Sequence, residues 1–273
     1  MNRIMFLGTG GGGHTMFYQV KRTGGIYFEL DAEKGPVKFI LDPGPGSLVF
    51  AHALGLKPES WNGVVLSHLH ADHATDANVL LDGIKDAFLV AEENCIRMDE
   101  KKPVDYPCVS MYHQKQIKEL FPVKHGQIIK THGIEFHATR TNHYAPALGF
   151  KIKSSKFTIG YAGDGSYLAG QEKFYDDCDV LILNIFYPKG MEARKGVHMG
   201  VDDAITLVKG IKNKPRLVII QHLSLFMLRT NMFRQVKIIK DATKIDTIHA
   251  EDFMEINLDT LATKIHDVKI VVK

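Results

Sequence analysis

Four side chains that commonly bind metal ions lie within six residues of one another in the stretch Trp61–Asp76. They are His68, His70, Asp72 and His73. Neutral imidazole is the commonest metal ligand in proteins, and a carboxylate adds a hard oxygen donor. On a loop, the spacing lets His68 and His70 point their rings the same way and hold one ion, while Asp72 and His73 can serve a second. A solvated polar loop is the alternative, but the density of donors favours a metal site.

The residues on either side of this cluster predict a turn between a strand and a helix. Gly63–Leu66 is a short apolar run with β-branched residues, which is typical of a buried strand. Beyond the cluster, Ala77, Leu80 and Ile84 recur at the spacing of one helix face. The cluster is therefore expected on the connecting loop, where catalytic residues are often found.

The sequence SHLHADH, Ser67–His73, resembles the HxHxDH signature of the metallo-β-lactamase-fold hydrolases. The resemblance implies a fold of the α/β (α+β) class, a four-layer αββα sandwich, with a hydrolytic centre of one or two metal ions. The opening GTGGGG and the stretch KRTGG are also similar to the ribonuclease Z-like phosphodiesterase branch. Ribonuclease Z has Arg-Tyr shortly after its last histidine, whereas HLSLFM follows His222 here. This departure argues against a true tRNA 3′-processing enzyme within the branch.

Three more candidate ligands each follow a predicted strand. His143 comes after a hairpin predicted over Gln127–Thr139, where the family has its third histidine ligand. Asp164 lies between two glycines after the predicted strand Lys156–Tyr161, and its two oxygens could bridge two ions about 3.5–4 Å apart. An aspartate in a glycine turn is the alternative. His222 follows another short apolar strand.

His198 and His222 compete for the last metal position. His222 follows a strand, as the family's terminal histidine does, whereas His198 precedes a helix predicted over Val201–Ile211. The ribonuclease Z branch has at this pre-helix position a non-ligand histidine that acts on the phosphate or the leaving group. The resemblance therefore assigns His222 to metal, and His198 together with Asp72 to catalysis. The predicted ligand sets are His68, His70, His143 and Asp164 for one ion, and Asp72, His73, Asp164 and His222 for the other.

The glycine-rich stretch Gly8–Gly13 satisfies the pattern GxGxxG, with Asp31 near the expected acidic distance. A dinucleotide-binding fingerprint must open a helix. The segment HTMFYQVKR that follows instead favours a strand, because it contains Thr, Phe, Tyr and Val. We therefore expect a tight loop whose backbone approaches the active site. His14 at its end is expected at the surface, with contact to the substrate as the alternative.

A predicted strand over Val37–Asp42 ends at an aspartate. Asp42 is similar to the family's aspartate that orients a metal ligand. An Asx turn before Pro43 is the alternative. A helix is expected from Leu48 to Leu54.

Composition places the chain among ordinary globular proteins, with 45% hydrophobic and 24% charged residues. A net charge of +3 does not by itself indicate nucleic acid binding. The sequence lacks an apolar run of about 18 residues, and three widely spaced cysteines suit a reducing compartment, so a cytoplasmic protein is expected. We expect a single domain over residues 1–273, with a lid or insertion at about 92–126 and a helix from Met111.

The expected function is a metal-dependent hydrolase, a phosphodiesterase or nuclease that uses a hydroxide bridging two divalent ions. Zn²⁺ is expected from the imidazole-rich donors, and Mn²⁺ or Fe would also suit them. A lactonase, thioesterase or other acyl hydrolase on the same centre is the alternative. A diiron redox protein is disfavoured by His70 in place of a glutamate, and a metal-free binding protein by the intact ligand set. The expected partner is a substrate, either a small-molecule phosphodiester or an RNA phosphodiester. We expect no association with a membrane, and a homodimer is an open alternative.

Overall fold

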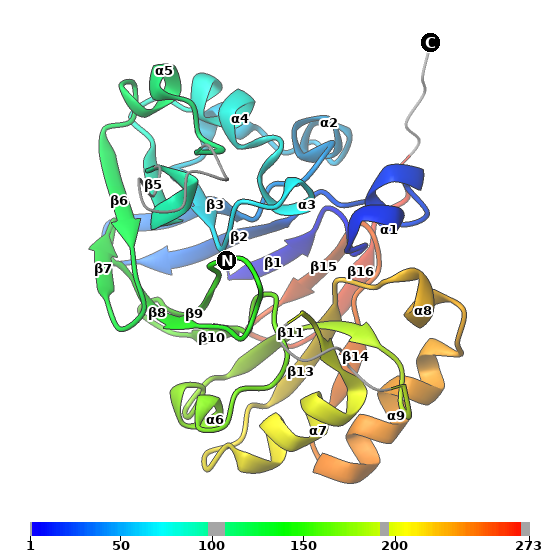
Figure 1. Cartoon of the computed structure of the whole chain (residues 1–273). Helices are drawn as coiled ribbons and strands as arrows, with labels where there is room; N and C mark the ends of the chain where they lie inside the picture. The colour runs from blue at the N-terminus through cyan, green and yellow to red at the C-terminus, as the bar shows by residue number, and fades with distance from the viewer. Residues whose placement is uncertain (1, 98–106, 192–196, 269–273) are drawn as a thin grey trace. The chain divides into compact units, whose positions relative to one another are not determined.

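The computed structural model of the chain describes residues 2–97, 107–191 and 197–268. The chain forms two compact units, each with one eight-stranded sheet and helices against it (Figure 1). Unit 1 contains Met1–Thr9, Lys21–Val123 and Glu251–Lys273, and unit 2 contains Gly10–Val20 and Lys124–Ala250. The expectation of one domain over residues 1–273 stays a prediction.

The sheet of unit 1 has the strand order β16-β15-β1-β2-β3-β4-β5-β6. Neighbouring strands from β16 to β3 are antiparallel, and those from β3 to β6 are parallel. Because parallel strands start and end at the same edges, the carboxyl ends of β3 and β4 are adjacent. The strands are β1 (Arg3–Phe6), β2 (Ile26–Ala32), β3 (Gly35–Leu41), β4 (Gly63–Leu66), β5 (Phe88–Glu92), β6 (Glu119–Val123), β15 (Met254–Asn257) and β16 (Thr263–Ile265).

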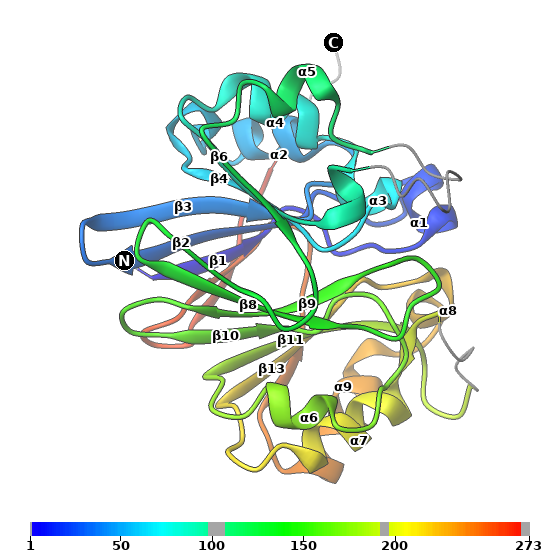
Figure 2. The ribbon, with the colours of Figure 1, turned by 60° about the vertical axis from the view of Figure 1, so that its left-hand side comes forward.

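Helices α2, α4 and α5 of unit 1 lie on one face of its sheet (Figure 2). Phe50, Leu80 and Leu81 on these helices are buried in one apolar cluster with Trp61 and Leu89. The predicted helices after Pro43 and after the histidine cluster are confirmed by α2 and α4. The helices are α2 (Ser47–Ala53), α3 (Ala71–Ala74), α4 (Ala77–Gly83) and α5 (Met111–Gln114), with 3-10 turns at Pro58–Ser60 and Glu93–Cys95.

The sheet of unit 2 has the strand order β14-β13-β11-β10-β9-β8-β7, and β12 pairs with β11. Strands β7 to β10 are antiparallel, which confirms the predicted hairpin, and strands β10, β11, β13 and β14 are parallel. The strands are β7 (Ile128–Thr131), β8 (Ile134–Arg140), β9 (Leu148–Lys153), β10 (Thr158–Tyr161), β11 (Val180–Tyr187), β12 (Met199–Gly200), β13 (Leu217–Gln221) and β14 (Thr247–His249).

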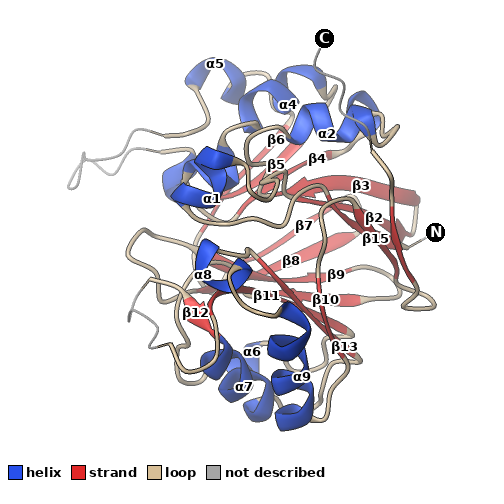
Figure 3. Cartoon of the chain, turned by 90° about the vertical axis from the view of Figure 1, so that its right-hand side faces the viewer, coloured by secondary structure: helices blue, strands red, loops and turns tan. Residues whose placement is uncertain are grey.

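Helices α6, α7 and α9 of unit 2 lie on one face of its sheet (Figure 3). Leu207 of α7 and Ile239 of α9 are buried with Leu181 of β11 and Val218 of β13 in one apolar cluster. The helices are α1 (Gly13–Tyr18), α6 (Gln171–Phe174), α7 (Val201–Gly210), α8 (Leu225–Leu228) and α9 (Met232–Thr243). Within the described part of the chain, no helix has the length and apolar character needed to cross a membrane.

The strand predicted after the glycine-rich stretch is wrong, because the structure has helix α1 there. Thr15 is the buried residue of this helix, whereas Phe17 and Tyr18 are exposed, so the segment lacks the alternation that holds a strand on a sheet. The glycines still do not form a dinucleotide fingerprint. The strand that follows, β2, pairs antiparallel with β1, whereas the fingerprint needs a parallel strand–helix–strand unit.

The segment predicted as a lid or insertion, 92–126, contains an edge strand. Its residues 98–106, with the charged cluster at 99–102, lie outside the described residues. Strand β6 (Glu119–Val123) pairs parallel with β5 at the end of the sheet, so this part belongs to the sheet. Helix α5 begins at Met111 as predicted and ends after one turn.

Candidate metal centre

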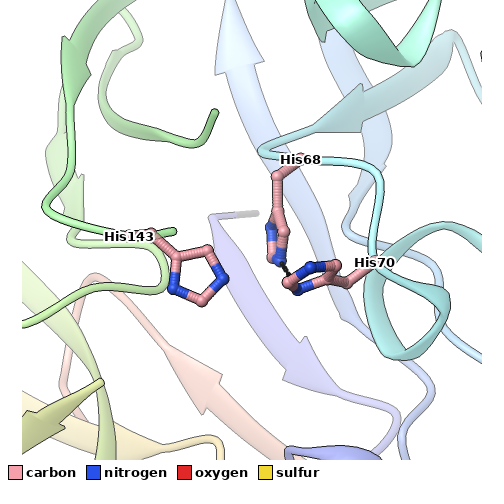
Figure 4. Close-up of side chains that lie close together, drawn as sticks. All are labelled: His68, His70 and His143. Atoms are coloured by element: carbon pink, nitrogen blue, oxygen red, sulfur yellow. Dashed lines mark hydrogen bonds between the residues drawn. The ribbon is translucent and has the colours of Figure 1, made fainter. Parts of the chain in front are cut away.

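The predicted donor cluster of unit 1 lies at the carboxyl end of β4. His68 and His70 follow the strand, and α3 begins directly after His70, so that Asp72 and His73 lie in its first turn. The rings of His68 and His70 meet edge to face, and His68 Nε2 is 3.0 Å from His70 Nδ1 (Figure 4). His68 and His73 are buried, whereas His70 and Asp72 are partly exposed. The turn between a strand and a helix therefore brings imidazole nitrogens together as predicted.

Asp42 determines which nitrogen of two histidine rings carries the proton. Its carboxylate accepts the Ser67 hydroxyl hydrogen bond, at 2.6 Å. A serine hydroxyl has one proton, so Ser67 Oγ must accept from His68 Nδ1, which is 3.0 Å away. His73 Nδ1 donates to the same carboxylate at 3.0 Å. In both neutral rings the lone pair is then on Nε2, and this is how a carboxylate prepares histidines for metal binding.

Asp42 reaches these partners because it ends β3 beside the end of β4. Its backbone N–H donates to the carbonyl of Val65 at 2.9 Å, which continues the parallel pairing. Asp42 then adopts a left-handed conformation with φ of 52°, which aspartate tolerates better than most residues. Its Oδ1 also accepts from the Ser67 backbone N–H at 2.6 Å. Asp42 therefore contacts His73 directly and His68 through Ser67, and its role in orienting a metal ligand stays a prediction.

The predicted donors of unit 2 meet around Asp164. Asp164 follows β10, His222 follows β13, and His198 precedes β12. His222 Nε2 lies 3.3 Å and His198 Nδ1 3.5 Å from Asp164 Oδ2. Because β10, β11 and β13 are parallel, their carboxyl ends share one edge, which places Asp164 and His222 together. His222 has a left-handed backbone with φ of 60°, a conformation that is costly for a non-glycine residue and clusters at functional sites.

Asn184 holds the carboxylate of Asp164, a role that was missed in the sequence. It lies in β11, is almost fully buried, and donates from Nδ2 to Asp164 Oδ1 at 2.6 Å. Its own side-chain oxygen accepts a hydrogen bond from Gln221 Nε2. A single polar residue within the apolar run VLILNIFY was the available signal, because buried polar groups are hydrogen-bonded.

His143 follows β8, as predicted, and is oriented by the chain before His198. Its Nδ1 is 2.6 Å from the carbonyl oxygen of Val197, which can only accept, so Nδ1 carries the proton. The neutral ring then has its lone pair on Nε2. The rings of His143 and His198 lie 5.3 Å apart, so this histidine belongs to the same part of unit 2 as Asp164.

The glycine loop before α1 packs directly against this cluster. A Cβ atom on Gly11 would lie 2.2 Å from His222 Cγ, so the bare backbone is in contact with the imidazole. The Gly11 N–H donates to the carbonyl of Leu223 at 3.3 Å, which fixes the loop beside His222. The loop therefore approaches His222, one of the predicted ligands. His14 at its end is exposed, as expected of a surface residue.

Phe186 supports His198 from β11. The two rings are stacked with centroids 4.2 Å apart and planes 7° apart. The His198 side chain is 12% exposed, so it is held in place and remains open to solvent. Phe186 was not singled out in the sequence, because an aromatic residue in a buried strand is ordinary core.

The chemistry of both donor sets fits a divalent cation. Imidazole nitrogens and carboxylate oxygens are the ligands that Zn²⁺ and related ions take. Within unit 1, nitrogen atoms of His68 and His73 lie within 4.8 Å of each other and of the Asp42 carboxylate that orients them. Within unit 2, the same holds for Asp164, His198 and His222. By distance alone, His198 could therefore be a ligand as well as His222.

Comparison with known proteins places the chain in a family. Residues 38–223 match a family that is described as "Beta-lactamase superfamily domain". An uncharacterized protein of Methanocaldococcus jannaschii, MJ1374, is 30% identical over 263 residues, which cover 93% of this chain and 94% of that protein.

Solved structures with the same fold include two that span nearly the whole chain. The metallo-beta-lactamase fold protein YhfI from Bacillus subtilis has 18% identity and a TM-score of 0.75, covering 94% of this chain and 100% of its own. The short form of human tRNase Z has 18% identity and a TM-score of 0.66, covering 94% and 99%. At these identities the likeness shows the fold alone. Both the fold class and the resemblance predicted from SHLHADH are confirmed.

Proposed function

The chain belongs to the beta-lactamase superfamily, and we propose that within this family it is a metal-dependent phosphodiesterase. The fold is that of the metallo-hydrolases and implies divalent metal ions. We propose two ions, Zn²⁺ first, with Mn²⁺ or Fe as the other candidates. The proposed ligands are those predicted from the sequence, namely His68, His70, Asp72, His73, His143, Asp164 and His222.

The residues around these ligands hold them in the state that binds metal. Bound divalent ions would lower the pKa of a water molecule and neutralise charge on a phosphoryl oxygen. Asp42 keeps His68 and His73 in the tautomer that has its lone pair on Nε2. Asn184 keeps the carboxylate of Asp164 turned toward the histidines of unit 2. Such hydrogen bonds reduce the reorganisation that metal binding would otherwise need.

The position of His198 carries the choice of a phosphodiester, because the ribonuclease Z-like phosphodiesterases have a non-ligand histidine at this place before the helix. Hydrolysis of a phosphodiester expels an alkoxide, which needs a proton as it leaves, and a positioned acid contributes about 10²–10⁴-fold to the rate. His198 lies beside Asp164, its ring stacks on that of Phe186, and its side chain is partly exposed to solvent. It can therefore hold a proton at its ring nitrogen and deliver it to a leaving oxygen. His198 and Asp72 are proposed as the catalytic residues.

The test compares kcat/KM of the metal-replete protein on two classes of substrate. Bis(p-nitrophenyl) phosphate and a short RNA represent phosphodiesters, and a homoserine lactone and a glutathione thioester represent acyl substrates. We expect the phosphodiesters to be preferred. A hundredfold or greater preference for the lactone or the thioester would overturn the proposal and favour an acyl hydrolase on the same centre.

A further inference from the structure

A cavity of about 190 Å³ in unit 2 adjoins the residues that surround His198 and His222. Phe186 lines the cavity and stacks on His198. Gly11 also lines the cavity, and it contacts the ring of His222. The lining of the cavity includes Gly11, Gly12, Phe186, Phe226 and Arg229. The cavity therefore lies next to the proposed proton donor.

The walls of this cavity are mainly aromatic and apolar. The rings of Phe186 and Phe226 are 6.1 Å apart with planes at 60°, so together they form an angled aromatic wall. Phe226 is 43% exposed, so part of its ring is accessible to a ligand in the cavity. Gly12 has φ of 81°, and a Cβ atom there would lie 2.6 Å from Phe186 Cε2. The bare backbone at Gly12 therefore lets the loop pack against the ring while leaving the cavity open.

Arg229 gives the cavity its charge. It is exposed at the lining, and within the described part of the chain no carboxylate lies at ion-pair distance from it. A guanidinium is planar, always charged, and pairs with phosphate oxygens through two parallel hydrogen bonds. Aromatic walls with one guanidinium match a ligand that has a planar ring and an anionic group.

The volume limits the ligand to a single ring. Pockets for drug-sized ligands have about 300–1,000 Å³, and this cavity is smaller. We infer that it binds one nucleobase-sized aromatic ring of the substrate, while Arg229 pairs with the phosphate of the same nucleotide or aryl ester. This inference rests on the proposed function for the reaction. Ring binding, however, can be measured without turnover.

The experiment measures binding of three phosphates to the metal-replete full-length protein by titration calorimetry. They are UMP, phenyl phosphate and ribose 5-phosphate, of which the last has no aromatic ring. Stacking on an aromatic side chain is expected to give a ring-bearing ligand about 5- to 150-fold tighter binding. Tighter binding of UMP than of phenyl phosphate would identify the ring as a nucleobase, and the reverse would identify a simple aryl ester.

Variants of Phe226 and Arg229 test the assignment. Phe226→Ala should remove most of the preference for ring-bearing ligands, whereas Phe226→Tyr should keep it. Arg229→Ala should weaken the binding of all three phosphates by a similar factor. Phe233→Ala is the matched control, because Phe233 is 78% exposed on α9 and lies outside the cavity lining; it should leave all three affinities unchanged.

The results separate this inference from the proposed function. The inference is overturned if ribose 5-phosphate binds as tightly as UMP and phenyl phosphate, or if Phe226→Ala keeps the ring preference. If the ring preference and its loss are found but phosphodiesters are not hydrolysed, the proposed function fails and the ring subsite stands.

Discussion

Replacing Asp42 by asparagine should weaken metal binding while leaving the protein folded. In the native protein the carboxylate accepts three hydrogen bonds, two from Ser67 and one from His73. An asparagine of nearly the same shape has one oxygen and one NH₂ group. If the NH₂ group takes the place of Oδ2, it faces both the Ser67 hydroxyl and His73 Nδ1, and if it takes the place of Oδ1, it faces the Ser67 backbone N–H. The proton on His68 or His73 could then move to Nε2, the nitrogen that would bind the metal.

The size of the effect follows from the hydrogen bonds that change. A hydrogen bond to a charged group contributes about 1.5–3 kcal/mol, so losing one should lower the free energy of unfolding by about that amount. Loss of a hydrogen bond that orients a metal-binding histidine typically weakens metal affinity or activity by about 10–100-fold. We expect a decrease in Zn²⁺ affinity within that range.

The assay is a competition for Zn²⁺ between the protein and a chromophoric chelator, together with ¹⁵N spectra of the histidine rings. Asp252→Asn is the matched control, because Asp252 also accepts three hydrogen bonds, at 3.0 and 2.7 Å from Thr9 and 3.1 Å from the backbone N–H of Arg22. It should lose stability but keep the metal affinity. Unchanged affinity and unchanged tautomers in Asp42→Asn, or an equal loss of affinity in Asp252→Asn, would refute the reasoning.

Three further substitutions have distinct expected results. His198→Ala should keep the metal content and lower kcat by about 10²–10⁴-fold; loss of one ion, measured by elemental analysis, would show that His198 is the ligand instead of His222. Gly11→Ala should displace the His222 ring, lowering stability by about 1–3 kcal/mol and also kcat/KM, because the new Cβ would lie 2.2 Å from the ring; native values of both would contradict the contact. Burial raises the pKa of Glu92 from 4.5 to about 7 in the folded protein. The contribution of Glu92 to the free energy of unfolding is therefore fully present below pH 4.5, where the carboxyl is protonated in both states, and is lost as the pH rises through about 7. Glu92→Gln should therefore stabilise the metal-free protein more at pH 8 than at pH 5, by up to about 3 kcal/mol in urea unfolding, and an equal effect at both pH values would contradict this.

The parts of the fold and site that depend on local sequence were predictable. The apolar run before His68 and the helical spacing after it predicted the turn between β4 and α4. Asp164 and His222 each follow an apolar run, and the parallel pairing of β10, β11 and β13 explains why such residues meet. The positions of these two candidate ligands along the chain were enough to predict that they meet, because each directly follows one strand.

Features that depend on contacts between distant segments could not be predicted. The stacking of Phe186 on His198 joins β11 to the residue before β12, and nothing in either segment indicates it. The strand preference of the segment after Gly13 was outweighed, because α1 forms there and its burial does not alternate as in a strand. Asn184 was detectable as a polar residue in an apolar run, but its contact with Asp164 depends on a segment 20 residues away in the chain.

Metal content and phosphodiesterase activity measured on the same samples of His68→Ala and wild-type protein test the central claim most directly. The wild type should carry divalent ions and hydrolyse bis(p-nitrophenyl) phosphate, and His68→Ala should lose metal and kcat/KM together. His137→Ala is the control, because His137 contacts Glu135 on β8 and should keep both. A His68→Ala protein that retained two ions per chain and full turnover would contradict a metal-dependent phosphodiesterase built on this histidine cluster.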